Sequence, residues 1–346
     1  MEYEVTIGIP VYNTEEYAKR MMESVMAQTF ESIEILILDD CGTDASMDII
    51  RDYQQNHPRG KDIRIVRQPR NMGIGEARCR LVTEARGKYF FFLDADDAIA
   101  PNAIELLHDN AIRYQADIVY GSYEQYFTKD NKTLEKRIYR YETMHLLEPD
   151  SFAQWAYAKY SHLQAQTWNF LIDLEIYRKN NLNYMPLNFW EDFTFTINLP
   201  IYIHRAVLLS DITYFYYRRE GSLSVPRRRN HIDKSETDNT ISSLNQLKFK
   251  IDIVRNKPYF SRWLFKIMMT EFYVVCNIIS KRHIISPKYS DRELRDAMKS
   301  PLSLKEILEL PDLKVRNFAM YMLGVMPPVV SVNVVRLLGK GRGLIT

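Results

Sequence analysis

Residues 89–97, Tyr-Phe-Phe-Phe-Leu-Asp-Ala-Asp-Asp, pass directly from a run of apolar side chains into three carboxylates. A short apolar run bounded by polar residues is typical of a strand that is buried on both faces of a parallel sheet. In an open α/β sheet, ligands bind outside the carboxyl ends of the strands. The stretch therefore predicts a central strand that carries Asp94, Asp96 and Asp97 to a ligand-binding edge.

Taken alone, the three carboxylates have two interpretations. Unpaired carboxylates repel one another, and a hard divalent cation, which prefers oxygen ligands, would relieve that repulsion. Alternatively, residues 94–97 only end the strand and cap a helix that begins near Pro101, because Asp and Pro favour the first positions of a helix. The rest of the chain has to decide between a metal site and a helix cap.

Strands and helices alternate along the first hundred residues. Strands are expected at residues 5–11, 34–38 and 63–66, and helices at about 15–28, from about 45, and at about 74–85. Asn13 or Thr14 is the expected N-cap of the first helix. This alternation predicts βαβ units and a mostly parallel sheet flanked by helices. Right-handed crossovers would bring the polar strand ends together on one edge of that sheet.

Each polar cluster at these strand ends also has a structural interpretation. Asp40, Asp44 and Asn71 are ordinary turn or cap residues, and Arg78 can be a surface cation. A carboxylate at Asp39, however, can accept a hydrogen bond from a base N–H, and Arg78 is placed to reach a phosphate or a base. The chain contains no Gly-x-Gly-x-x-Gly and no Walker sequence. Phosphates bound here would therefore need a metal ion and basic side chains.

Four segments resemble, in order and spacing, the motifs of family 2 glycosyltransferases of the GT-A fold. They are Ile-Pro-Val-Tyr-Asn at 9–13, Leu-Asp-Asp-Cys-Gly-Thr-Asp at 38–44, Asn-Met-Gly-Ile-Gly-Glu-Ala-Arg at 71–78 and Leu-Asp-Ala-Asp-Asp at 93–97. The resemblance implies the GT-A fold of nucleotide-diphospho-sugar transferases for this part of the chain. Cys41 stands where the family most often has glycine, which affects the turn and none of the ligating groups.

The resemblance also implies a donor site. Asp39 would read the uracil of a UDP-sugar, and Pro10 and Tyr12 would pack at the base. Residues 94–96 correspond to the family's Asp-x-Asp (DxD) motif, in which Asp96 would be the main contact for Mn²⁺ or Mg²⁺ and Asp94 a second one. The remaining donor contacts expected from the motifs are Asn71, Arg78 and Ala95.

Two further stretches resemble family motifs beyond residue 160. Trp-Glu-Asp at 190–192 resembles the Glu-Asp motif at the start of a helix over the sugar, and Trp168-Asn169 resembles the family's Trp-Asn. Carried over, Asp192 is the catalytic base, and a helix N-terminus would favour its ionised form. Trp168, Trp190 and Glu191 are expected to contact the acceptor, with a second metal contact as an alternative for Glu191. An acidic helix cap is the structural alternative for Trp-Glu-Asp.

Residues 214–224 look like the family's Tyr-x-Arg segment followed by Ser-x-Ser. This likeness implies a loop in which Arg218, Ser222 and Ser224 close over the diphosphate. An exposed basic turn is the alternative. We divide the chain on these grounds into a nucleotide-sugar-binding half (1–120), an acceptor-binding half (121–230) and a helical appendage (231–346).

The appendage shows long helical patterns. Apolar residues at 241, 244, 247, 251 and 254 form one stripe of an amphipathic helix, and Lys266 and Glu271 indicate that residues 263–280 pack inside the protein. Residues 317–335 carry no charge, but Gly324 and two prolines interrupt them, and their flanks are basic. The appendage either packs on the catalytic domain or lies on an anionic membrane surface.

Composition limits the classes of partner and compartment. The 346 residues carry 46 Lys and Arg against 44 Asp and Glu, a net charge of +2, which gives no reason to expect a nucleic acid partner. Three unclustered cysteines suggest neither a disulfide framework nor a zinc site, and the acidic first residues lack the features of a signal peptide. We expect a cytoplasmic protein, with peripheral attachment to the inner face of the cytoplasmic membrane left open.

The resulting hypothesis is an inverting, metal-dependent glycosyltransferase of surface-polysaccharide synthesis. Its donor would be a UDP-sugar and its acceptor a saccharide or a lipid-linked saccharide. A nucleotidyltransferase on a similar sheet is one alternative, although residues 10–13 offer neither the glycines nor the cation that would hold a triphosphate. A non-catalytic scaffold that binds nucleotide-sugars is the other. The sequence names neither the sugar, the acceptor nor the oligomeric state.

Overall fold

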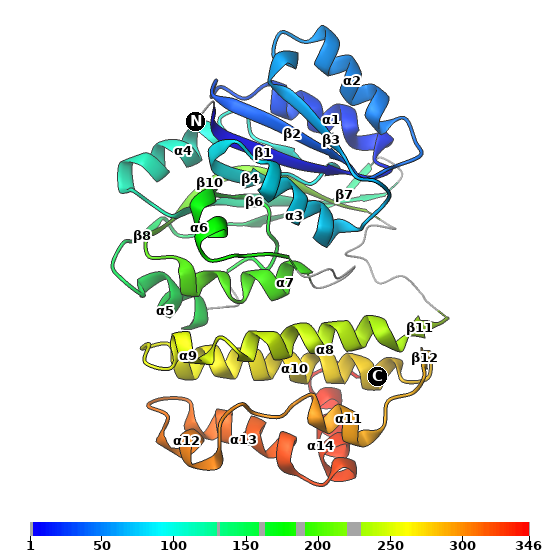
Figure 1. The fold of residues 1–346 in the computed structure, drawn as a ribbon, viewed down its shortest axis with the longest axis vertical. Helices are drawn as coiled ribbons and strands as arrows, with labels where there is room; N and C mark the ends of the chain where they lie inside the picture. The colour runs from blue at the N-terminus through cyan, green and yellow to red at the C-terminus, as the bar shows by residue number, and fades with distance from the viewer. Residues whose placement is uncertain (1–2, 130–131, 159–162, 185–190, 220–229, 346) are drawn as a thin grey trace. The chain divides into compact units, whose positions relative to one another are not determined.

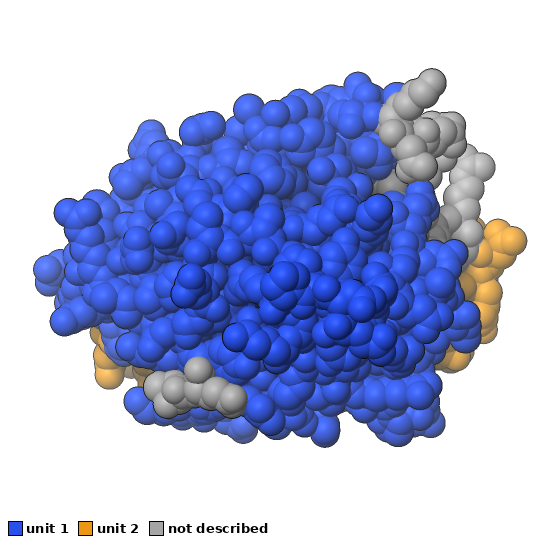
Figure 2. Space-filling model, turned by 90° about the horizontal axis from the view of Figure 1, so that it is seen from above, with its two compact units in different colours: residues 1–152, 161–227 blue, residues 153–160, 228–346 orange. Residues whose placement is uncertain are grey.

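The computed structural model describes residues 3–129, 132–158, 163–184, 191–219 and 230–345 (Figure 1). The chain divides into two compact units, shown in different colours in Figure 2. Unit 1 comprises residues 1–152 and 161–227, and unit 2 comprises residues 153–160 and 228–346. Each unit is described by itself below.

Unit 1 is built on a ten-stranded mixed sheet. Its main strand order is β3-β2-β1-β4-β9-β6-β10-β5, with β7 paired to β6 and β8 paired to β10. The strands are β1 (Tyr3–Val11), β2 (Ile33–Asp39), β3 (Ile63–Arg67), β4 (Gly87–Phe92), β5 (Ala98–Ile99), β6 (Ile118–Lys129), β7 (Lys132–Tyr139), β8 (Met144–Leu146), β9 (Phe170–Asp173) and β10 (Ala206–Arg219).

The predicted parallel sheet is confirmed for the first four strands. β2, β3 and β4 each run parallel to their neighbour, and β1 lies between β2 and β4. β9 then pairs antiparallel with both β4 and β6, so the second half of the sheet is mixed. All seven residues of β2 are buried, as expected for an apolar run with both faces covered.

Helices follow the strands of unit 1 as the alternation predicts. They are α1 (Glu15–Met26), α2 (Ser46–Asn56), α3 (Ile74–Glu84), α4 (Ala103–Tyr114), α5 (Ser151–Ala158), α6 (Leu174–Lys179) and α7 (Glu191–Thr196), with 3-10 turns at η1 (Gly60–Asp62) and η2 (Leu199–Tyr202). Most of α5 belongs to unit 2. α3 packs on β1 and β2, and α4 packs on β6, β9 and β10, which buries the sheet beneath them.

The cap expected from Asn13 or Thr14 is made by a different residue. Thr14 precedes α1, but its side chain makes no capping hydrogen bond. Asp44 instead accepts a hydrogen bond from the Glu15 amide at 2.9 Å, and its other oxygen accepts from the Ser46 amide at 3.1 Å. One carboxylate thus caps two helices, because the ends of β1 and β2 lie side by side in the sheet.

Unit 2 is helical apart from a two-stranded parallel pair. Its elements are β11 (Ile232–Asp233), α8 (Lys234–Lys248), α9 (Ile251–Val254), α10 (Phe260–Lys281), β12 (Ile285–Ser286), α11 (Asp291–Asp296), α12 (Leu304–Glu309), α13 (Lys314–Val325) and α14 (Pro328–Gly341). The expectation of one continuous amphipathic helix over 241–254 was wrong, because α8 ends at Lys248 and α9 begins at Ile251.

The central helix α10 is a packed helix, as the charges within it indicate. By length and composition it is the one helix among the described residues that could cross a membrane, yet 67% of its most apolar window is buried inside the protein. Burial lowers the pKa of Lys266 to about 8. The Glu271 carboxylate lies 2.6 Å from Lys248 Nζ, so charges inside this unit are matched by neighbouring helices.

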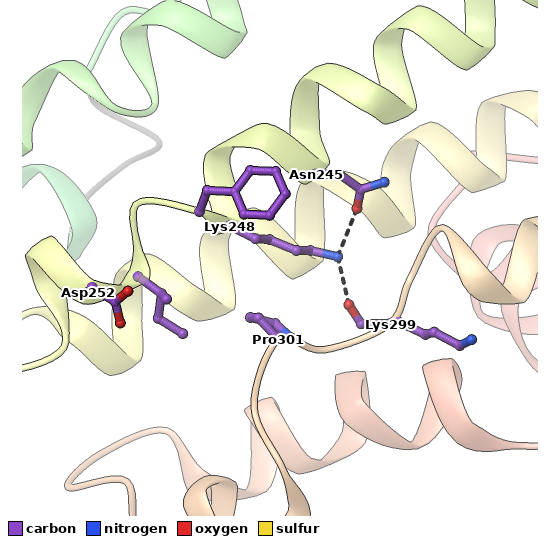
Figure 3. A pocket seen from close by; sticks show the side chains of 7 residues that line it. Asn245, Lys248, Asp252, Lys299 and Pro301 are labelled. Carbon is purple, nitrogen blue, oxygen red and sulfur yellow. Dashed lines mark hydrogen bonds between the residues drawn. The ribbon is translucent and has the colours of Figure 1, made fainter.

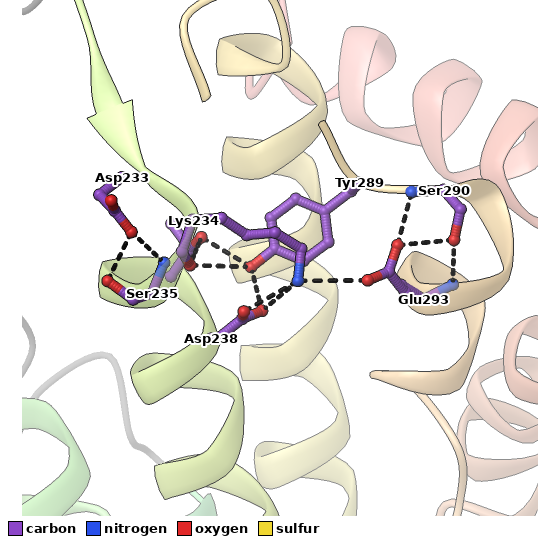
Figure 4. Close-up of polar contacts among 8 residues, drawn as sticks. Asp233, Lys234, Ser235, Asp238, Tyr289, Ser290 and Glu293 are labelled. Atoms are coloured by element: carbon purple, nitrogen blue, oxygen red, sulfur yellow. Dashed lines mark hydrogen bonds and ion pairs between the residues drawn. The ribbon is translucent and has the colours of Figure 1, made fainter. Parts of the chain in front are cut away.

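Two hollows lie on the surface of unit 2. One of about 530 Å³ is lined by Asn245, Phe249 and Pro301, and there Lys248 donates to the Asn245 side chain and the Lys299 carbonyl (Figure 3). The second, of about 270 Å³, contains a network in which Lys234 bridges Asp238 and Glu293 while Tyr289 donates to Asp238 (Figure 4). Both sets of polar groups join α8 to the chain around α11.

Gly87 at the start of β4 tests the close packing of the central strands. A Cβ built there would lie 2.6 Å from the Thr6 amide nitrogen on β1. We expect Gly87→Ala to force the strands apart and to destabilise the protein by about 1–3 kcal/mol. The measurement is the midpoint of urea unfolding.

Gly341 supplies the matched control, because a Cβ there meets nothing within 4 Å. Gly341→Ala should leave the midpoint unchanged or raise it slightly. Equal midpoints for the two variants would contradict the tight contact between β1 and β4.

Candidate active site

The ends of β1 and β2 place the predicted base-reading residues side by side. Val11 pairs with Asp39 in the sheet, and Tyr12 follows with a half-exposed ring. Asp39 is buried; one of its oxygens accepts the Cys41 amide at 2.9 Å and the other lies 3.4 Å from Arg67 Nε. A carboxylate has about four acceptor positions, so Asp39 keeps capacity for a ligand N–H. Pro10 is buried in β1 just before this edge.

Asp40 holds the next loop to the strand end. Its two oxygens accept hydrogen bonds from the amides of Met72 and Gly73, at 2.9 and 3.2 Å. Burial raises the pKa of Asp40, although the two backbone hydrogen bonds oppose this shift. Asn71 also accepts from the Gly73 amide, which confirms the predicted turn. The first residues of α3 are therefore fixed next to β2.

The unusual cysteine sits at a strained position of the turn. Cys41 has a φ of 60°, a left-handed conformation that glycine adopts at no steric cost. This conformation explains why a glycine is common at this place in the motif. The Cys41 thiol donates to the Gln68 carbonyl at 3.1 Å, so the side chain has a partner where glycine would have none.

The three carboxylates after β4 separate into two groups. Asp94 and Asp96 are partly exposed, whereas Asp97 is completely buried. Tyr214 donates its hydroxyl hydrogen to one Asp97 oxygen and the Tyr217 amide donates to the other, both at 2.8 Å. Burial, followed by the charges of Asp96 and Asp94, raises the pKa of Asp97 well above its usual value. Asp97 thus anchors the turn, and only Asp94 and Asp96 remain for a ligand.

Arg20 supports the same turn from α1. Its guanidinium donates to the Asp96 carbonyl at 2.5 Å and lies 3.6 Å from the centroid of the Tyr217 ring. The Tyr214 hydroxyl also accepts a hydrogen bond from the Asp94 amide at 3.2 Å. Sequence reasoning gave Arg20 no role and placed Tyr214 only within the segment that resembles Tyr-x-Arg. Their contacts with this turn were missed because both residues are far from it in the chain.

A buried arginine joins the predicted base to the DxD motif. Arg78 on α3 is 3% exposed; it donates to Asp192 Oδ1 and lies 3.3 Å from Asp94 Oδ1. α7 begins at Glu191, so Asp192 lies in its first turn as predicted. Thr167 Oγ1 donates to the same Asp192 oxygen at 2.8 Å. The cation and the hydroxyl together hold this carboxylate oxygen in place.

Trp168, expected to contact the acceptor, is instead part of the core. Its ring is 2% exposed and stacks on Tyr214, with centroids 4.5 Å apart. The neighbouring Asn169 donates to the Gly121 and Ser122 carbonyls of β6, so the Trp-Asn pair fixes β9 within the sheet. The prediction failed because a tryptophan beside polar residues looks the same in sequence whether it faces a ligand or supports a neighbour that does.

The other predicted contacts fall partly outside the described residues. Trp190, Ser222 and Ser224 lie in the segments that the structure leaves out, as does the side chain of Glu191. Arg218 is described near the end of β10, with its guanidinium 5.6 Å from the centroid of the Phe127 ring. Ala95 is buried within the turn between Asp94 and Asp96.

The described side chains show no group of three or more His, Cys, Asp or Glu placed to hold a metal ion. The donor set nevertheless suits a hard divalent cation, because Asp94 and Asp96 offer carboxylate oxygens at an accessible strand end. Mg²⁺ is commonly held by one or two carboxylates together with substrate phosphates. Such a cation would complete its coordination with a bound diphosphate.

The family model "Glycosyl transferase family 2" matches residues 6–180, which span both the strand-end motifs and the Trp-Asn pair. This match covers half of the chain. The chain belongs to glycosyltransferase family 2. Membership makes this protein a glycosyltransferase, and it argues against the nucleotidyltransferase and scaffold interpretations.

Curated bacterial glycosyltransferases are similar to this family 2 enzyme over most of its length. GlyG of Streptococcus pneumoniae is 26% identical over 63% of this chain and 72% of its own. The cholesterol galactosyltransferase of Borreliella burgdorferi is 25% identical over 81% of this chain and 79% of its own. The match to GlyA of Streptococcus pneumoniae, at 27% identity, covers only 31% of that longer protein.

Solved structures of Staphylococcus aureus TarS share the fold. The TarS 1–349 complex with UDP-GlcNAc superposes with a TM-score of 0.64 at 17% identity, covering 98% of this chain and 92% of that one. The complex with UDP gives a TM-score of 0.63 at 15% identity over the same shares. This likeness establishes the GT-A fold of the family 2 enzyme.

Replacement of Arg78 tests whether the buried guanidinium organises the site. Arg78→Gln should reduce transfer by at least about 100-fold, because Asp192 and Asp94 lose the charge that matches them. The measurement is kcat/KM for sugar transfer.

Arg80 on the same helix is the matched control, because it is half-exposed and pairs with Glu84. Arg80→Gln should retain the rate. A normal rate in Arg78→Gln would show that the guanidinium does not organise the site.

Burial of Asp97 gives a second prediction, on the pH dependence of stability. A carboxyl whose pKa is raised by folding binds its proton more tightly in the folded state. Its contribution to the free energy of unfolding is therefore lost as pH rises from about 4 through the folded pKa. The unfolding temperature of the unmodified protein should therefore fall, relative to Asp97→Asn, between pH 5 and pH 8. Asp48→Asn, at an exposed position on α2, should run parallel to the unmodified protein. A constant difference between Asp97→Asn and the unmodified protein would contradict a raised pKa.

Proposed function

We propose that this glycosyltransferase moves a sugar from a UDP-sugar to a hydroxyl of a saccharide or lipid-linked saccharide, with inversion at the anomeric carbon. The observation that carries the proposal is the link from Asp192 through Arg78 to Asp94, at the carboxyl ends of the strands. A candidate base and the DxD motif meet there, although 114 residues separate Arg78 from Asp192.

The donor half of the proposal rests on the first strands. Asp39 and Tyr12 lie at the adjacent ends of β2 and β1, where the uracil would bind. TarS binds UDP and UDP-GlcNAc with the same fold, which supports a uridine nucleotide here. Asp94 and Asp96 would hold the divalent cation, Mn²⁺ or Mg²⁺, and a bound cation would offset the negative charge of the leaving diphosphate.

Asp192 would act on the acceptor. Its carboxylate takes the proton of the acceptor hydroxyl while that oxygen forms a bond to the anomeric carbon, and the bond from this carbon to the UDP oxygen breaks. Thr167 and Arg78 hold one oxygen of Asp192, which orients the carboxylate for proton transfer. A single displacement of this kind converts an α-linked donor into a β-linked product.

The class of product is inferred from a relative of this chain. The Escherichia coli chondroitin synthase, a polysaccharide-forming enzyme, is 41% identical to this chain over 105 residues, 15% of its own length. We infer a role in polysaccharide synthesis of the bacterial surface.

Nucleotide binding separates the roles of the two carboxylates. UDP with Mn²⁺ should raise the unfolding temperature of the unmodified protein, and chelator should abolish most of the increase. Asp192→Asn should keep this increase, because Asp94 still pairs with Arg78, and should lose transfer by about 1,000-fold or more, because the proton acceptor is removed. Asp96→Asn should lose the metal-dependent part of the increase together with activity.

Asp48→Asn again serves as a control, with normal binding and normal transfer expected. GDP, TDP and CDP tested beside UDP identify the base. Normal transfer by Asp192→Asn would exclude Asp192 as the base, and the absence of any shift with all four nucleotides would exclude the donor site.

A further inference from the structure

The last two helices of unit 2 expose apolar side chains that no other part of unit 2 covers. Val315 is 81% exposed and Leu337 is 72% exposed. Together with them, the outward apolar residues of α13, α14 and the link between them are Phe318, Val325, Val329, Val330 and Leu338. We call this set the α13–α14 face.

The face is not the side by which these helices pack. α13 buries Asn317, Met320, Leu323 and Gly324, and contacts α10, α12 and α14. The exposed positions of α13 include the apolar Val315, Phe318 and Val325 beside the basic Lys314 and Arg316. A surface helix normally presents polar and charged residues opposite its packed side. The outer side of α13 is thus typical of a surface that binds something apolar.

The charge of the protein is concentrated at the same place. Residues 313–346 contain Lys314, Arg316, Arg336, Lys340 and Arg342, and no Asp or Glu. The other 312 residues therefore carry 41 basic against 44 acidic side chains, a net charge of −3. The chain as a whole is nearly neutral, while this segment carries +5.

Nearby acidic side chains do not cancel this charge. On α11, which packs against α14, Asp291 pairs with Arg282, Glu293 with Lys234, and Asp296 with Arg295 and Lys299. Asp312, just before α13, pairs with Arg262. Each of these acids is matched by a base from outside residues 313–346. The positive charge of the segment thus remains available to an external partner.

We propose that the α13–α14 face binds an anionic lipid bilayer. Aliphatic and aromatic side chains beside basic ones suit a helix pair that lies in the interface, with apolar residues among the acyl chains and Lys and Arg at the headgroups. A second copy of the chain fits less well, since two such faces would bring like charges together. The buried helix α10 is not the attachment, because its apolar residues are used within unit 2.

This inference goes beyond sugar transfer and is independent of it. It places the enzyme at a membrane surface, and a lipid-linked acceptor would then be the natural substrate form. Binding to vesicles needs neither nucleotide nor acceptor. The failure of one proposal is therefore distinguishable from the failure of the other.

The test is co-sedimentation of the full chain with vesicles of phosphatidylcholine alone and of phosphatidylcholine mixed with phosphatidylglycerol. We expect binding to the mixed vesicles that weakens with added salt. Arg336→Gln combined with Lys340→Gln should weaken it by about 25-fold, at about fivefold per charge. Leu337→Asp should weaken vesicle binding by about tenfold or more. All three residues are exposed, so the variants should keep the fold.

Matched controls lie outside the face. Phe249→Asp changes an exposed apolar residue at the end of α8, and Lys19→Gln removes an exposed charge from α1. Both should bind vesicles normally. The proposal is overturned if no vesicle is bound at low salt, or if the control variants weaken binding as much as the face variants. Concentration-dependent dimers that Leu337→Asp dissociates, without vesicle binding, would assign the face to a second copy.

Discussion

A guanidinium group that is almost entirely removed from water has to be matched by negative charge, and Arg78 is matched by two carboxylates. Asp94 comes from the turn after β4 and Asp192 from the first turn of α7. Leaving either charge buried without the other would cost several kcal/mol. The start of α3, the end of β4 and the start of α7 are therefore held together by one ionic contact. The candidate active site is built around that contact.

Tyr214 on β10 supports the same site through three contacts. Tyr214 accepts from the Asp94 amide, donates to Asp97 and stacks on Trp168. Asp97 is completely buried and held by two donors, so the turn that presents Asp94 and Asp96 has little freedom to rearrange. Preorganised side chains of this kind avoid reorganisation during the reaction, which is one way in which enzymes stabilise a transition state.

Unit 2 is held together mainly by apolar packing around one helix. Its core is α10, whose apolar residues are covered by α8, α13 and α14, and its buried charges are paired between helices. The outward side of α13 and α14 departs from this pattern, since it exposes aliphatic side chains next to unmatched basic residues. A helical unit with one such face can attach a catalytic unit to a surface while leaving the strand-end site unchanged.

Local patterns were sufficient for much of unit 1. The alternation of strands and helices predicted β1 to β4 and α1 to α3 within a few residues, because each buried strand needs an unbroken apolar run. The motifs identified the strand ends that carry Asp39 and Asp94. Thr14 is the N-cap residue of α1, as expected, but the side chain that caps the helix is Asp44, which reaches Glu15 only after β1 and β2 pair.

By itself, the sequence determined the parallel first half of the sheet, the positions of the strand-end carboxylates and the family, because these depend on short runs of residues. Tertiary structure alone decided that Asp97 is buried while Asp94 and Asp96 face outward, that Trp168 supports the site from the core, and that Arg78 connects Asp192 to Asp94. Each of these depends on contacts between residues far apart in the chain. Which side chain loses its water, and which partner then matches its charge, is settled only when the strands and helices pack.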